Sequence, residues 1–161
     1  EYIRMKNDNI SYYYLDLYRW YTNKSREYIE IPEGAQFPIW FSLTEEYRLQ
    51  PTPGTVVLKM EIPRDKLLII DSEKWDYRGN NMYVPKDKAD REAFEQKLSK
   101  YGIGDETALV EQLGNFYPML KKELVASWER IFTMPPSDLE KGFATCWELK
   151  QDWVKEVTVS E

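Results

Sequence analysis

The chain contains no histidine, and this absence removes more chemistry than any other feature of its composition. Histidine is the usual general base near neutral pH and the commonest protein ligand of transition metals. Nucleophiles activated by a Ser–His or Cys–His pair are excluded with it. The sequence therefore argues against a zinc enzyme, and we assign no metal-binding residues.

Cysteine is almost as scarce, because Cys146 is the only one in 161 residues. A single thiol cannot form an intrachain disulfide, which fits a reducing compartment, and we expect a cytoplasmic protein. The sequence opens on Glu1, without methionine and without a positively charged apolar leader. We therefore also expect the natural chain to extend further at its N-terminus.

Long apolar runs and an excess of positive charge are missing too. The longest apolar runs span a few residues, as at 67–70, whereas a membrane-spanning helix needs roughly 20. Lys and Arg total 22 against 28 Asp and Glu, which gives a net charge of −6. A surface of this sign repels phosphate backbones. We expect no membrane insertion and no general nucleic-acid binding, so the partner is an unknown small molecule or protein.

The common motifs of catalysis and nucleotide binding are absent as well. The sequence has no G-x-G-x-x-G, Walker A loop, C-x-x-C, H-E-x-x-H or G-x-S-x-G. What is present is a large apolar content of 42%, with an aromatic share of 15%, which argues against disorder. A chain of this length buries about 70% of its unfolded surface around one core. We expect a single domain over residues 1–161.

The periodicity of apolar residues predicts both helices and strands. Helices are expected over residues 11–27, 85–100 and 118–132, with a short one that begins at Asp71 or Ser72. Strands are expected over residues 37–43, 55–62, 67–70, 143–149 and 154–159. Strands at both ends of the chain, without regular βαβ alternation, favour an α+β fold. We predict a mixed, mainly antiparallel sheet with helices packed against it.

Two groups of polar residues are candidates for chemistry on this evidence alone. Asp71, Glu73 and Asp76 follow a strand closely and could hold Mg²⁺ or act as general acid and base, although helix capping also explains them. Trp128 and Arg130 lie in the helical segment 127–132. Packing explains the tryptophan, and the arginine could hold a substrate or form a structural ion pair.

Several motifs, taken in order, carry a family resemblance. They are Pro-Ile-Trp at 38–40, Thr-Val-Val-Leu at 55–58 with Glu-Ile-Pro at 61–63, the strand 67–71 followed by Trp75, Ser-Trp-Glu-Arg-Ile-Phe at 127–132, and Ala-Thr-Cys-Trp-Glu at 144–148 with Val154. Together they resemble a bacterial family described only as a domain of unknown function. The resemblance covers about residues 37–157 and implies no activity.

A second similarity concerns the C-terminal segment. A strand that carries Glu148, a short turn and a closing strand rich in valine resemble the last motif of ADP-ribosyltransferase-like folds. In those folds a glutamate orients the ribose of NAD and stabilises an oxocarbenium-like centre. The resemblance implies that Glu148 is the catalytic carboxylate and that NAD is the candidate cofactor. The alternative is that Glu148 is an outward-facing strand residue.

Three functional hypotheses follow, and the sequence leaves open whether the chain is an enzyme. The first is an NAD- or nucleotide-directed transferase that uses Glu148. Its candidate cofactor-binding residues are Trp40, Ser42, Tyr47, Trp128 and Arg130. The second is a non-enzymatic protein-interaction module, which an extended apolar patch without convergent polar groups would favour. The third is an acidic, metal-dependent hydrolase built on the three carboxylates after the strand at 67–70.

Overall fold

The computed structural model describes residues 9–160, which divide into two compact units. Unit 1 comprises the described residues up to 69 together with those from 142 onward, and unit 2 comprises residues 70–141. The α+β class is confirmed. The expectation of one domain over residues 1–161 stays a prediction. Within residues 9–160, no helix has the length and apolar character needed to cross a lipid bilayer.

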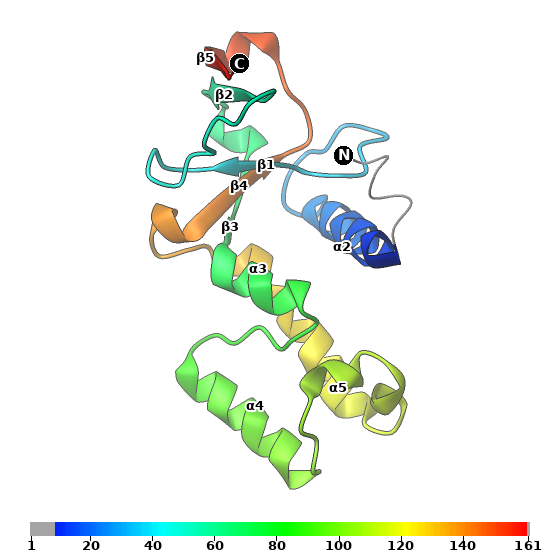
Figure 1. Ribbon diagram of the computed structural model, residues 1–161. Helices are drawn as coiled ribbons and strands as arrows, with labels where there is room; N and C mark the ends of the chain where they lie inside the picture. The colour runs from blue at the N-terminus through cyan, green and yellow to red at the C-terminus, as the bar shows by residue number, and fades with distance from the viewer. Residues whose placement is uncertain (1–8, 161) are drawn as a thin grey trace. The chain divides into compact units, whose positions relative to one another are not determined.

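Unit 1 contains one long helix, a three-stranded sheet and a two-stranded ribbon (Figure 1). The helix is α2 (Asn9–Ser25), and the sheet has the order β1 (Ile39–Ser42), β4 (Gly142–Cys146) and β3 (Leu68–Asp71), of which the last ends in unit 2. Strands β1 and β4 are antiparallel, with Ile39 opposite Cys146 and Ser42 opposite Phe143. The first strand of the sheet therefore pairs with a strand from the far end of the sequence.

An aromatic stack fixes α2 to this sheet. The ring of Tyr21 is fully buried and stacks on Trp40 and Trp147, with centroid distances of 5.6 and 5.8 Å. The Tyr21 hydroxyl shares a hydrogen bond of 2.8 Å with the hydroxyl of Thr145 on β4, and the Trp147 indole N–H donates to Thr22 at 2.9 Å. Burial raises the pKa of Tyr21, so this hydroxyl stays protonated as a donor.

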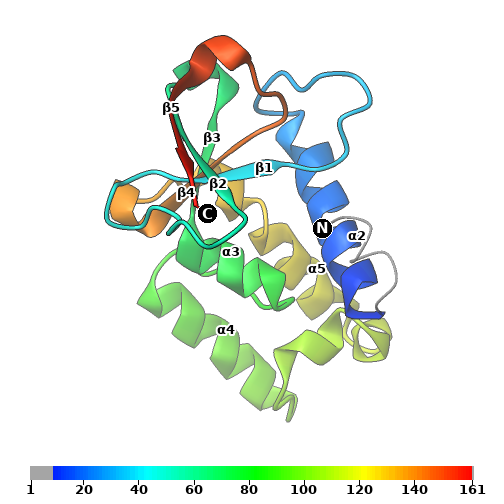
Figure 2. The ribbon, with the colours of Figure 1, turned by 45° about the horizontal axis from the view of Figure 1, so that its top comes forward.

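The two-stranded ribbon consists of β2 (Val56–Met60) and β5 (Val154–Val159), which lie side by side in Figure 2. The strands are antiparallel and aligned so that Lys59 faces Glu156, with an irregularity after Lys59. Backbone hydrogen bonds close both ends of the ribbon, from Glu61 N–H to Trp153 at 2.8 Å and from Gly54 N–H to Ser160 at 3.0 Å. This ribbon forms one wall of the site described below.

Unit 2 is helical, and its helices are α3 (Ser72–Gly79), α4 (Lys88–Lys100), α5 (Pro118–Ser127) and α6 (Arg130–Thr133). Helices α3 and α5 begin where the sequence predicts them, whereas the helix predicted from residue 85 begins at Lys88. Asp71 caps α3 by accepting from the Lys74 N–H at 3.0 Å. The helix predicted over 118–132 is divided into α5 and α6, because the Ser127 hydroxyl donates to the Leu124 carbonyl and competes with the helical hydrogen bonds.

A partly buried network around Asp90 joins α4 and α6 of unit 2. Its carboxylate accepts from the Tyr83 hydroxyl at 3.0 Å, the Lys86 N–H at 3.0 Å and the Arg130 guanidinium at 2.7 Å. The ring of Tyr83 stacks on Phe94 with a centroid distance of 4.0 Å. Burial alone would raise the pKa of Asp90, but the three donors together hold that pKa below its usual range.

We expect the variant Asp90→Asn to lower the free energy of unfolding by about 1–3 kcal/mol at pH 7, because hydrogen bonds to a charged acceptor are lost. A carboxyl group whose pKa is lower in the folded state than in the unfolded state stabilises the folded protein at pH values above its unfolded-state pKa. This contribution is lost as the pH falls through the folded-state pKa. The difference between the two proteins should therefore shrink below about pH 4. Urea unfolding across this range measures it, with the exposed Glu92→Gln as control; a difference independent of pH would contradict the prediction.

Candidate functional site

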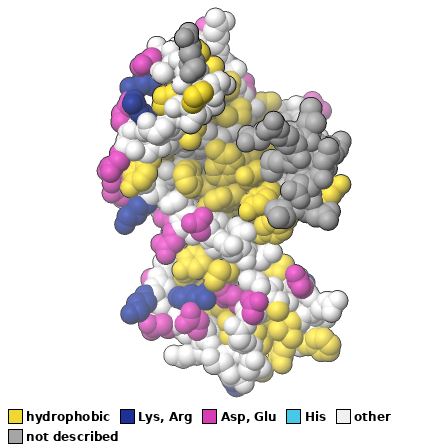
Figure 3. Space-filling view, in the orientation of Figure 1, with side chains coloured by type: hydrophobic (Ala, Val, Ile, Leu, Met, Phe, Trp, Pro, Cys, Tyr) yellow, Lys and Arg dark blue, Asp and Glu magenta, His cyan; other side chains and the backbone are white. Residues whose placement is uncertain are grey.

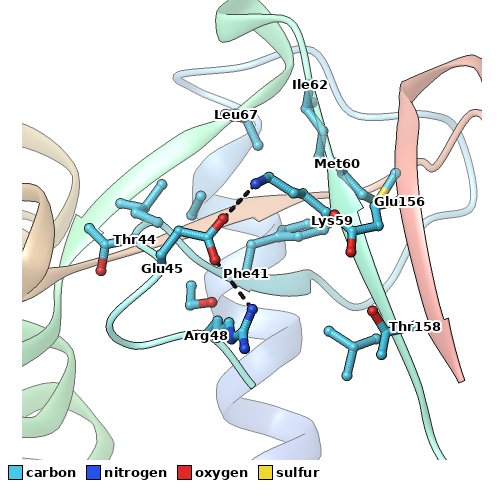
Figure 4. Close-up of a pocket in the computed structure, with 14 residues that line it drawn as sticks. Phe41, Thr44, Glu45, Arg48, Lys59, Met60, Ile62, Leu67, Glu156 and Thr158 are labelled. Atoms are coloured by element: carbon cyan, nitrogen blue, oxygen red, sulfur yellow. Dashed lines mark hydrogen bonds and ion pairs between the residues drawn. The ribbon is translucent and has the colours of Figure 1, made fainter. Parts of the chain in front are cut away.

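A pocket of about 370 Å³ lies in unit 1 between the end of β1, the loop that follows it and the β2–β5 ribbon (Figure 4). Its volume is in the range of sites that hold small ligands. The lining consists of apolar side chains with a few charged and hydroxyl groups. The lining residues are Phe41, Ser42, Leu43, Thr44, Glu45, Arg48, Val57, Lys59, Met60, Ile62, Leu67, Ala144, Glu156 and Thr158.

The ribbon presents its polar face to this pocket. Side chains of residues that pair across two strands lie on the same face of a sheet. Val57 is opposite Thr158 and Lys59 is opposite Glu156, and all four line the pocket. We call these four residues the inner face of the ribbon.

The charged groups of the pocket are arranged around one carboxylate (Figure 4). Glu45 accepts a hydrogen bond from Lys59 Nζ at 2.5 Å and lies 3.6 Å from the Arg48 guanidinium. The hydrogen bond between Glu45 and Lys59 lowers the pKa of the carboxylate and raises the pKa of the amine. Both groups are therefore charged at neutral pH, and neither is poised as a general acid or base. The arrangement suits the binding of a charged group better than proton transfer.

Thr44 leaves one polar group of the pocket unsatisfied. Its hydroxyl oxygen is buried and has no hydrogen-bond partner among residues 9–160. A buried hydroxyl without a partner costs about 1–3 kcal/mol relative to one that is solvated. The oxygen is closed off from solvent as well, so the unsatisfied hydroxyl is a cost to the fold and is not presented to a molecule in the pocket.

The opposite face of the ribbon is aliphatic and exposed. Val56 pairs with Val159 and Leu58 pairs with Val157, so these four side chains share one face, which we call the outer aliphatic face. Their exposed fractions are 57%, 65%, 41% and 55%. Antiparallel sheets usually bury the apolar face and solvate the polar one. In this ribbon the aliphatic face is exposed, and most of the polar face is exposed too. Figure 3 shows exposed hydrophobic side chains on one face of the molecule, gathered between charged ones.

The structure corrects the predicted position of Glu148. The strand predicted over 143–149 ends at Cys146, so Glu148 lies in the loop after β4 and not in a strand. The strand ends early because Trp147 turns into the core of unit 1 and donates to Thr22. The Glu148 carboxylate lies 3.5 Å from Lys150 Nζ, and its carbonyl accepts from Cys146 Sγ. Glu148 is not among the described residues that line the pocket.

The predicted cofactor-binding residues of unit 1 are separated by the fold. Ser42 lines the pocket. Trp40 belongs to the aromatic core instead, where it also meets Phe143 edge-on at a centroid distance of 6.2 Å. The side chain of Tyr47 is largely exposed, in the loop that also carries Glu45. In the described chain, Ser42 is thus the one member of this group that contributes to the pocket.

The two predicted residues of unit 2 make structural contacts there. The Trp128 indole N–H donates to the Met82 carbonyl at 2.9 Å, and the Arg78 guanidinium lies 3.8 Å from its ring centroid. Arg130 donates to Asp90 and to the Val84 carbonyl. Both side chains thus hold unit 2 together, in agreement with the packing and ion-pair alternatives derived from the sequence.

The acidic group after β3 has a capping role in the structure. The Asp71 carboxylate accepts from the Lys74 N–H and lies 3.4 Å from Lys74 Nζ. Glu73 lies in the first turn of α3, where a negative charge stabilises the helix. Nowhere in residues 9–160 do three Asp, Glu or Cys side chains form a group that could hold a metal ion. The geometry therefore gives no support to the hydrolase hypothesis.

Sequence reasoning did not identify Glu45, Arg48 and Lys59 as site residues. One signal was present, because residues 156–159 alternate polar and aliphatic in the order Glu, Val, Thr, Val. Such alternation indicates a strand with two unlike faces, but the usual expectation is that the aliphatic face lies inward. The cross-strand register that brings Glu156 opposite Lys59 is not readable from the sequence.

Comparison with known proteins gives one family and no individual relative. The family model described as "Domain of unknown function (DUF3841)" matches residues 1–155. No curated protein and no solved structure gives a significant match. The similarity to ADP-ribosyltransferase-like folds, which was inferred from the C-terminal segment, stays a prediction.

We expect Thr44→Val to raise the free energy of unfolding of the ligand-free protein by about 1 kcal/mol, because it removes a buried hydroxyl that has no partner among the described residues. The matched control is Thr158→Val, an exposed position in the same pocket, where the change should stay within about 0.5 kcal/mol. Urea unfolding of both variants gives the measurement. Destabilisation by Thr44→Val would mean that the hydroxyl is hydrogen-bonded in solution.

Proposed function

Because the chain belongs to the DUF3841 family, whose description names no activity, we infer its function from its own surface. We propose that it is a non-enzymatic protein-binding module, which recognises an extended aliphatic segment of a partner protein. The observation that carries this proposal is the outer aliphatic face of the β2–β5 ribbon.

The exposure of this face is costly for an isolated protein. Complete burial of one Val or Leu side chain contributes about 1.5–3 kcal/mol, and each of these four side chains is 41–65% exposed. A two-stranded ribbon is also only marginally stable by itself in water. A partner that covers the outer aliphatic face would therefore bury apolar area and stabilise the ribbon at once.

The shape of the surface favours an extended segment as the occupant. The ribbon has two strands, so within residues 9–160 each strand has one edge that no further strand occupies. An added strand would form backbone hydrogen bonds with such an edge, and its alternate side chains would pack against the neighbouring side chains of the outer aliphatic face and cover part of it. Because Val56, Leu58, Val157 and Val159 carry no polar group, the matching side chains of the partner are aliphatic.

The ionisable groups of unit 1 whose pKa is shifted support binding over catalysis. The hydrogen bond with Lys59 lowers the pKa of Glu45, and burial raises the pKa of the Cys146 thiol. Neither group has its pKa moved toward the value that a general base or a reactive thiolate needs at neutral pH. This is the combination of an apolar patch with no poised reactive group that favours an interaction module.

The test uses a photo-crosslinking amino acid, p-benzoylphenylalanine, in place of Val159 in the full chain. We expect irradiation in cells that express the protein to give an adduct of one defined mass, since the probe lies on the outer aliphatic face. Adding Leu58→Asp should reduce the adduct about tenfold or more, because a charge must then be buried at the contact. Leu49→Asp is the matched control, because Leu49 is a 71% exposed aliphatic residue of unit 1 that lies outside the ribbon.

The crosslinking yields of the two variants decide the test. Loss of the adduct with Leu58→Asp and its retention with Leu49→Asp, at unchanged circular dichroism, would support the proposal. No adduct, or an equal yield from both variants, would overturn it.

The transferase hypothesis derived from the sequence has its own test. We expect calorimetric titration with NAD to show no binding that depends on Glu148, because its carboxylate lies beside Lys150 and outside the described lining of the pocket. The native protein is compared with Glu148→Gln. Saturable NAD binding that this substitution removes would favour the transferase over the interaction module.

A further inference from the structure

The inner face of the ribbon points to a second binding site, which does not depend on the outer aliphatic face. We propose that the pocket in Figure 4 binds a small amphipathic monocarboxylate, whose carboxylate replaces that of Glu45 between Lys59 and Arg48. In the absence of this ligand, Glu45 holds the place of the ligand's acidic group.

The ion pair between Glu45 and Lys59 can be displaced by a ligand. Glu45 and Lys59 are 64% and 61% exposed, and Glu45 comes from a loop and not from a strand. Ion pairs this exposed are screened by water and hold their partners weakly. Glu45 can turn to solvent at little cost, which leaves Lys59 and Arg48 together on the pocket with no carboxylate between them.

The remaining charges select the kind of acid. Arg48 offers a planar fork that matches a carboxylate, and Lys59 adds a compact positive charge. Glu156 stands opposite Lys59 on the inner face and acts on it electrostatically. A second negative charge on the ligand would be repelled by Glu156, so a monoanion fits this site better than a phosphate dianion.

The rest of the lining can contact the apolar part of the ligand. Phe41, Leu43, Ile62 and Leu67 contribute hydrophobic surface to the same lining. Ligand sites combine such apolar walls with a few polar groups that fix orientation.

The first measurement compares octanoate with octanol by isothermal titration calorimetry of the full chain. The two molecules share an apolar body and differ in the carboxylate. We expect saturable binding of octanoate and at least tenfold weaker binding of octanol, because the charge-assisted hydrogen bonds are lost. Equal binding of the two, or none of either, would overturn the proposal.

Matched variants then test the role of each charge. Lys59→Met should weaken octanoate binding about tenfold, whereas Lys155→Met should not, because Lys155 is a lysine of the same strand pair that contacts Glu61 and does not line the pocket. Glu45→Gln should tighten binding, because it removes the competing carboxylate. Its control is Glu61→Gln, which removes an exposed carboxylate elsewhere.

A gain in affinity for Glu45→Gln cannot arise from a damaged fold, so this variant protects the test against unfolding. Unchanged or weaker binding for Glu45→Gln, or equal losses for Lys59→Met and Lys155→Met, would contradict the proposal. Crosslinking at position 159 reports on the opposite face, so the failure of one proposal leaves the other to be judged independently.

Discussion

Unit 1 depends on pairing between strands that are about a hundred residues apart in the sequence. Ile39 on β1 is aligned with Cys146 on β4, and Val56 on β2 with Val159 on β5. Pairing over such separations carries a large cost in chain entropy, which the local contacts of each strand cannot offset. The stack of Tyr21 between Trp40 and Trp147 supplies buried aromatic area at this closure. The stack joins the helix α2 to the β1–β4 pair.

Local signals in the sequence were sufficient for most elements. Apolar periodicity located α2 and α4, and the capping residue Asp71 located the start of α3. The strands β2, β3 and β5 lie where β-branched and aliphatic residues cluster. These signals depend on neighbours within a few residues, so they do not specify which strands pair. The distribution of the strands over two sheets, and hence the pocket between them, could not be predicted for that reason.

Residue type was a poor guide to the candidate site. Trp40 and Trp128 were plausible walls of a ligand pocket, yet large aromatic side chains are also what a small core requires, and both pack in cores. Glu148 was assigned to a strand, but the burial of its neighbour Trp147 ends that strand first. Glu45 and Lys59 carry no motif. Their meeting depends on the register of the ribbon and the path of one loop.

The long separation between the two strands of the ribbon also affects how the protein is made. The chain between Met60 and Val154 is roughly 90 residues long, so at roughly 5–20 residues per second a ribosome needs about 5 to 20 s to pass from β2 to β5. Unit 2 lies within this interval as one continuous segment and has all of its helices before β5 exists. Throughout that time β2 lacks its partner strand, so its aliphatic side chains and its backbone hydrogen-bonding groups are open to other contacts of the nascent chain.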